Sequence, residues 1–88
     1  MLEALAEKAY ARAAIDGGLN ISVVNPEPAA IRSRVVRSAA ISAGAIASEL
    51  THSHVQALLA VGAGKEIQLP GHLTAYRDGD LLLFRRTD

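Results

Sequence analysis

Arginine and lysine side chains are the groups in this chain best suited to a chemical role. Arg32, Arg34 and Arg37 lie within one short segment, Lys65 follows later, and the only acid between Arg32 and Lys65 is Glu49. A guanidinium group presents a planar fork of donors that matches phosphate oxygens, and it stays charged at every physiological pH. This local excess of positive charge predicts contacts to the phosphates of a polyanion, although a row of charges is also typical of a solvated helix face.

Three more arginines, Arg77, Arg85 and Arg86, stand at the ends of strands expected near the C-terminus. Basic residues in such places can reach the phosphates of a nucleic acid. They serve equally well to keep an exposed strand edge from pairing with another chain. Together with the four basic residues named above, they complete the set for which the sequence predicts nucleic-acid contacts.

The histidine and serine side chains offer less chemistry. His52 and His54 are two residues apart, which points them in different directions on a helix, so a shared metal ion or proton relay is not expected. We expect His54 to pack beside Val55 with its ring nitrogens hydrogen-bonded, and His72 to lie in an exposed turn. No serine occupies a Gly-x-Ser-x-Gly pattern, and the chain has no cysteine. We therefore expect no catalytic residue, metal or cofactor within this chain itself.

The length and composition of the chain limit the kind of fold that can position these side chains. A chain of 88 residues predicts one small domain, spanning residues 1–88, with an aliphatic core because it contains only two tyrosines and one phenylalanine. Nine basic residues balance nine acidic ones, so the positive charge is local rather than overall. The lack of cysteine fits a reducing cytoplasm. No apolar run approaches the roughly 20 residues that span a bilayer, so no membrane partner is expected.

Apolar residues at helical spacing predict helices in the first two thirds of the chain. The first runs from Leu2 to about Ile15 and ends at Asp16-Gly17-Gly18. Residues 19–24 are rich in β-branched side chains and favour a short strand or an extended connector. A second helix begins near Pro28 and ends at Gly44. Its expected buried side consists of Ile31, Val35, Val36 and Ala39, which leaves Arg34 and Arg37 on one exposed face and Arg32 on another.

A third helix is expected after residue 50, followed by strands. Thr51 is a plausible N-cap, although Ser53 with Gln56 also fits a capping box, and glycines at 62 and 64 end the helix. Alternation then predicts strands around residues 67–69, 73–75 and 81–86, with a Pro70-Gly71 turn and a type I′ turn at Asp78-Gly79. The expected fold class is α+β, with about three helices followed by a C-terminal antiparallel β-hairpin or three-stranded meander.

Three segments together resemble the substrate-binding, C-terminal region of tRNA(Ile)-lysidine synthases. They are Ala30-Ile31-Arg32-Ser33-Arg34-Val35-Val36-Arg37, Leu50-Thr51-His52-Ser53-His54-Val55 and Ile67-Gln68-Leu69-Pro70-Gly71, in the order and spacing of that family. The opening Leu2-Glu3-Ala4-Leu5-Ala6 is similar to the helix that leads into this region. His72 departs from the family pattern, which often repeats glycine after Pro70-Gly71, so the family's turn geometry is not carried over to this position.

The resemblance implies that this chain binds the tRNA and that an upstream domain catalyses the reaction. The family's Ser-Gly-Gly-x-Asp-Ser loop for ATP phosphates has no counterpart here. The parent enzyme, as the resemblance implies, uses ATP, magnesium and lysine to convert the wobble cytidine of a tRNA, so that the anticodon reads isoleucine codons. This chain would then hold the tRNA for that catalytic domain, and tRNA and the upstream domain are its expected partners.

Two other interpretations remain open from the sequence. A protein-interaction or dimerisation module without direct RNA contact is suggested by the consecutive apolar residues Leu81-Leu82-Leu83-Phe84, which we expect to be exposed and to need a partner such as a second copy. A helix-turn-helix DNA reader would use the second and third helices. The connection from Gly44 to Leu50 is longer than the usual three or four residues of that motif, which argues against it.

Overall fold

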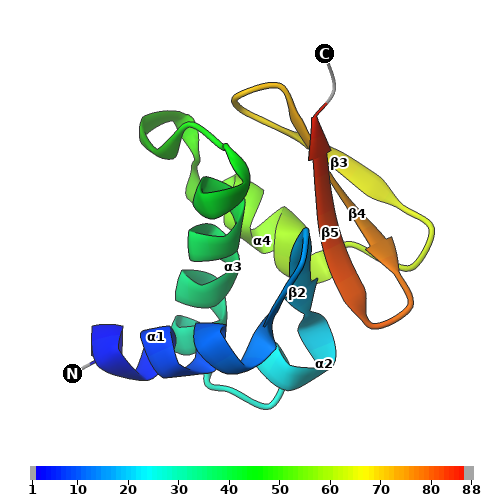
Figure 1. Ribbon diagram of the computed structural model, residues 1–88. Helices are drawn as coiled ribbons and strands as arrows, with labels where there is room; N and C mark the ends of the chain where they lie inside the picture. The colour runs from blue at the N-terminus through cyan, green and yellow to red at the C-terminus, as the bar shows by residue number, and fades with distance from the viewer. Residues whose placement is uncertain (1, 87–88) are drawn as a thin grey trace.

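Three helices supply half of the buried apolar residues of the computed structural model, which describes residues 2–86 (Figure 1). They are α1 (Leu2–Ala13), α3 (Ala29–Ala43) and α4 (His52–Ala60), joined in part by the short helices α2 (Ile21–Val24) and η1 (Ala47–Glu49). The sequence-predicted buried side of α3 is confirmed, since Ile31, Val35, Val36 and Ala39 are all buried. Helix α3 begins after Pro28 and ends at Gly44, whose φ of 121° continues no right-handed helix.

Helix α4 begins where Thr51 was expected to cap it. The Thr51 Oγ1 accepts the backbone N–H of His54 at 3.4 Å, and His54 Nδ1 in turn accepts the backbone N–H of Thr51 at 3.0 Å. This is a capping box with histidine in the place usually held by Glu or Gln. The alternative start at Ser53 is therefore wrong, and His54 is half-buried and hydrogen-bonded as predicted.

The strands form one antiparallel sheet in the order β1-β2-β5-β4-β3. The predicted C-terminal meander is present as β3 (Glu66–Leu69), β4 (Leu73–Asp78) and β5 (Leu81–Arg86). Two N-terminal strands, β1 (Ala14–Ile15) and β2 (Gly18–Asn20), extend it, because β2 pairs with β5. The fold is thus α+β as expected, but its sheet also uses a hairpin from the helical part of the chain.

The N-terminal hairpin corrects two sequence predictions. Helix α1 ends at Ala13, not at Ile15, since Ala14 and Ile15 pair with β2. The β-branched stretch up to Val24 is not a strand: after β2 it forms the helical turn α2, capped by the Asn20 side chain, which accepts the backbone N–H of Ser22 at 3.1 Å. Local capping and the burial of Ile21 and Val24 on one side outweigh β propensity here.

Close backbone packing at Gly18 explains how the hairpin joins the sheet. A Cβ added at Gly18 would lie only 2.0 Å from the carbonyl oxygen of Leu82. Only glycine therefore allows β2 to approach β5 so closely. The neighbouring Leu19, paired with Leu82, is completely buried.

One of the two turns of the meander differs from the sequence-based expectation. The loop between β4 and β5 consists of Gly79 and Asp80, because Asp78 already pairs with Leu81. Only Gly79 has a positive φ, 60°, so the predicted type I′ turn at Asp78-Gly79 is wrong, and the pattern is that of a type II′ turn. His72 is exposed as predicted, and it adopts a left-handed φ of 58° in the turn after Pro70-Gly71.

One face of the sheet packs on the helices and the other is only partly covered. Leu69, Leu73, Ala75 and Leu82 are buried on the helix side, together with Leu19. The Leu81–Phe84 run is therefore not an exposed strip: Leu82 is fully buried and its three neighbours are half-buried. None of the helices within residues 2–86 has the length and apolar character required to cross a bilayer.

Candidate functional site

The outward side of α3 carries Arg34 and Arg37, two of the cationic residues predicted to bind nucleic acid, and it is bordered by two open grooves. The first groove, of about 250 Å³, lies between α1 and α3. The second, of about 200 Å³, lies between α3 and the start of α4. Arg34 and Arg37 line both grooves, so they form the ridge that separates them, as their three-residue spacing predicted.

Arg32 leaves this ridge and stabilises the loop before α3. Its Nη1 donates to the backbone carbonyl of Glu27 at 2.7 Å and to that of Asn25 at 3.4 Å. The expectation that Arg32 projects from a different side of the helix is confirmed. Whether its remaining donors also meet RNA stays a prediction, but this side chain has a structural role of its own.

Arg37 combines a place on the ridge with a role in the fold. Its Nη1 donates to the carbonyl of Leu50 at 3.1 Å and its Nη2 donates to that of Ala47 at 3.3 Å. These bonds satisfy carbonyls in and just after the 3₁₀ turn η1, and they connect α3 to the entry of α4. The guanidinium is half-buried and its position is well fixed.

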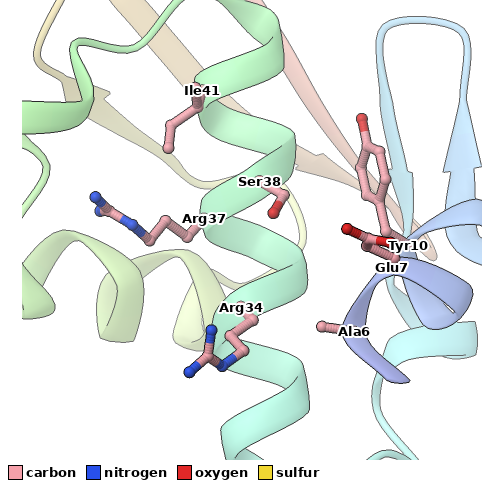
Figure 2. A pocket seen from close by; sticks show the side chains of 7 residues that line it. All are labelled: Ala6, Glu7, Tyr10, Arg34, Arg37, Ser38 and Ile41. Atoms are coloured by element: carbon pink, nitrogen blue, oxygen red, sulfur yellow. The ribbon is translucent and has the colours of Figure 1, made fainter. Parts of the chain in front are cut away.

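Arg34 is the contrasting member of the ridge. Its side chain is exposed, and within residues 2–86 its guanidinium makes no hydrogen bond or ion pair. Figure 2 shows Arg34 and Arg37 projecting from one side of α3, while Glu7 and Tyr10 of α1 lie on the other side of the groove with Ser38 between them. All donors of Arg34 therefore remain available to an anionic ligand.

The basic residues of the sheet lie in other surroundings. Arg77 donates to the carbonyl of Val61, just after α4, at 3.2 Å and to that of Gly79 at 3.1 Å. Arg85 pairs with Glu66 at 2.8 Å across the sheet, and its guanidinium carbon lies 5.0 Å from the centre of the Tyr76 ring. Arg86 follows at the end of β5, and it too has an interaction within the chain.

Lys65 lies at the start of the meander, where its carbonyl accepts the backbone N–H of Arg77 at 3.2 Å. Its side chain is exposed and makes no hydrogen bond or ion pair with the described part of the chain. The structure thus brings Arg34 and Arg37 together on α3, and Lys65 and Arg77 together at one end of the sheet. It distributes the seven predicted residues over separate surfaces rather than one patch.

The grooves also contain polar residues that the sequence did not single out for RNA contact. Ser38 and Tyr10 line the first groove, and His52 and Thr51 line the second. The spacing of Arg34 and Ser38, four residues apart, could have placed Ser38 beside the ridge. The position of Tyr10 could not have been found in this way, because it depends on how α1 packs against α3.

Residues 2–86 contain no group of three or more His, Asp or Glu side chains arranged to hold a metal ion. A scan against protein-family models and a search of curated proteins both returned no match.

Proposed function

We propose that this chain is a tRNA-recognition domain that works with a catalytic domain of the tRNA(Ile)-lysidine synthase type. The exposed and unpartnered guanidinium of Arg34 on the α3 ridge carries the proposal, because it is the group best placed to receive a phosphate. The resemblance of three sequence segments to that family supplies the identity of the RNA. The groove on each side of Arg34 gives a nucleic-acid backbone room to approach.

The neighbouring residues support a phosphate-binding role for this ridge. Arg37 holds a second cationic group in a fixed place, since its bonds to Leu50 and Ala47 limit its freedom. A preorganised side chain loses less conformational entropy when the ligand binds. Arg34 supplies adaptable contact and Arg37 supplies fixed positive potential, and such phosphate contacts position an RNA without reading its sequence.

The chemistry itself belongs, in this proposal, to the catalytic domain. That domain would use ATP, magnesium and lysine to modify the wobble cytidine, and this chain would orient the tRNA toward it. A cytoplasmic location follows from the same proposal, because the tRNA substrate is found there. Arg32, Lys65, Arg77, Arg85 and Arg86 are secondary candidates for contact with more distant parts of the RNA.

The decisive experiment compares Arg34→Glu with the matched charge reversal Lys8→Glu. Lys8 is an exposed residue of α1 that lines neither groove, so both variants change the net charge by the same amount. We expect Arg34→Glu to weaken binding of a fluorescein-labelled tRNA(Ile) transcript by about tenfold, the loss of one charge-assisted contact. Lys8→Glu should change the affinity less than twofold.

The dependence of affinity on salt gives an independent readout of the same contact. With two or three phosphate contacts, log K should fall against log salt concentration with a slope of about −2 to −3, and Arg34→Ala should reduce that slope by about 1. An affinity for tRNA that is equal in wild type, Arg34→Glu and Lys8→Glu would exclude the α3 ridge as the RNA-binding surface.

A further inference from the structure

A third hollow continues the surface beyond the α3 ridge, and it differs from the grooves in character. It has a volume of about 160 Å³ and lies between α1, the β1-β2 turn, the last turns of α3 and β5. The aromatic rings of Tyr10 and Phe84 line it, as do Ser42 and the backbone at Gly17 and Gly18. None of the side chains that line this hollow is charged.

Tyr10 makes this hollow continuous with the groove between α1 and α3, because it lines both. Three polar residues of α3 also follow this path. Arg34, Ser38 and Ser42 are spaced four residues apart, which places them along neighbouring turns of the helix. Figure 2 shows Ser38 on the side of α3 that faces Tyr10, while Arg34 projects away from it. All three residues nevertheless line the groove between α1 and α3, so a ligand that lies in this groove can contact Arg34 and reach the Tyr10 ring.

The polar groups along this path lack partners within the described residues. The hydroxyls of Tyr10, Ser38 and Ser42 make no hydrogen bond within residues 2–86. They can therefore donate to or accept from the edge of a ligand without losing an existing bond. The hollow thus combines aromatic walls, free hydroxyls and neutral lining, next to a cationic ridge.

This division of chemistry matches the two parts of a nucleotide. A phosphate needs positive charge and multiple donors, which Arg34 and Arg37 offer. An unstacked base needs an uncharged site with an aromatic face and a few hydrogen-bonding groups, and aromatic side chains are the usual partners of bases in single-stranded RNA. A duplex cannot occupy the hollow, because its bases are stacked inside the helix.

We propose that the hollow between Tyr10 and Phe84 binds one unpaired nucleobase of the RNA whose adjacent phosphates meet Arg34 and Arg37. This inference rests on the proposed function and extends it, because it requires the tRNA to present a single-stranded nucleotide beside a contacted backbone. The chain then distinguishes an RNA with an unpaired end or loop from a plain duplex through this base.

The test uses two fluorescein-labelled RNA hairpins with the same stem, each closed by a non-nucleotide linker so that neither has an unpaired loop base. One hairpin is blunt and the other has a single-stranded 3′ end. Wild type should bind the second about tenfold more tightly, in the range expected for stacking of one base on aromatic rings. Ser42→Leu should abolish this preference and leave the affinity for the blunt hairpin unchanged. Ser42 is exposed on α3, so leucine there fills the hollow without removing any core side chain.

Ser42→Ala is the matched control, since it removes the hydroxyl but leaves the hollow open, and it should retain most of the preference. Tyr10→Leu provides a second variant that keeps apolar packing but removes the ring, and thermal melting verifies that each variant is folded. Equal binding of both hairpins by wild type, or an intact preference in folded Ser42→Leu, overturns the base site. Arg34→Glu should weaken both hairpins equally, and if it weakens neither, the proposed function itself fails.

Discussion

The basic residues of α3 and those of the C-terminal meander carry the same charge but have different surroundings. In the meander, Arg77 bonds two backbone carbonyls and Arg85 pairs with Glu66 while lying over the Tyr76 ring. On α3, Arg34 is surrounded by open grooves and meets no acceptor within the described part of the chain. The difference shows that the nearest carbonyl or carboxylate, rather than the charge itself, decides whether an arginine is available to a ligand.

The same comparison applies within α3. Arg32 and Arg37 lie two and three residues from Arg34, yet both bond backbone carbonyls of neighbouring loops. A variant that removes all three arginines would therefore weaken the fold and the ridge at once. Single replacements at Arg34 separate ligand binding from stability, which is why the binding experiments above depend on that residue.

The largest expected effect concerns the sheet that holds the meander to the helices. Leu82→Ala removes a fully buried side chain between β2 and β4 and should lower the free energy of unfolding by about 3 kcal/mol. Leu83→Ala, at a half-buried position on the opposite face, should cost about 1 kcal/mol. Urea denaturation followed by circular dichroism measures both, and equal losses would contradict the assignment of the two sheet faces.

A smaller effect tests the comparison between the two sets of arginines directly. Arg77→Met keeps the apolar stem but removes the bonds to Val61 and Gly79, so the free energy of unfolding should fall by about 1–2 kcal/mol. Arg34→Met removes no such bond and should change it by less than about 0.5 kcal/mol. A loss for Arg34→Met as large as that for Arg77→Met would mean that the α3 ridge is structural.

The smallest expected effect lies in the turn between β3 and β4, which packs against the residues that follow α3. His72 adopts a left-handed φ of 58°, which costs energy for a residue with a Cβ, so His72→Gly should raise the free energy of unfolding by about 0.5–1 kcal/mol. Gly71→Ala is the opposite control, because a Cβ there would lie 2.7 Å from the carbonyl oxygen of Gly44 and should destabilise the protein. Thermal melting compares the two variants.

The spacing of apolar residues and the residues that cap or end helices predict much of this fold. The apolar spacing of α3, its end at Gly44 and the cap at Thr51 all depend on local rules, and the structure confirms them. The hairpin of β1 and β2 depends on pairing with a strand near the other end of the chain, which no local rule predicts. The helical turn at Ile21–Val24 was missed because its β-branched residues favour a strand, whereas the Asn20 cap and the burial of Ile21 and Val24 favour the turn.

The candidate site could be predicted from sequence only in part. The spacing of Arg34 and Arg37 predicted a shared exposed face, and both line the same grooves. The carbonyls that occupy Arg32 and Arg37 come from loops whose positions depend on tertiary packing, so their structural roles could not be predicted. The hollow between Tyr10 and Phe84 joins residues from the two ends of the chain, and no local pattern in the sequence predicts that they meet.

The pairing of β2 with β5 has a consequence for how the chain acquires its structure. Leu19 and Leu82 are partners although about 60 residues separate them, so the sheet closes only after the last strand has been synthesised. During translation the helices can begin to form first, and Leu19 then remains exposed to water until β5 leaves the ribosome. Such long-range closure slows folding, and a messenger RNA truncated before the codon for Leu81 would yield a product with an unsatisfied apolar edge that invites aggregation.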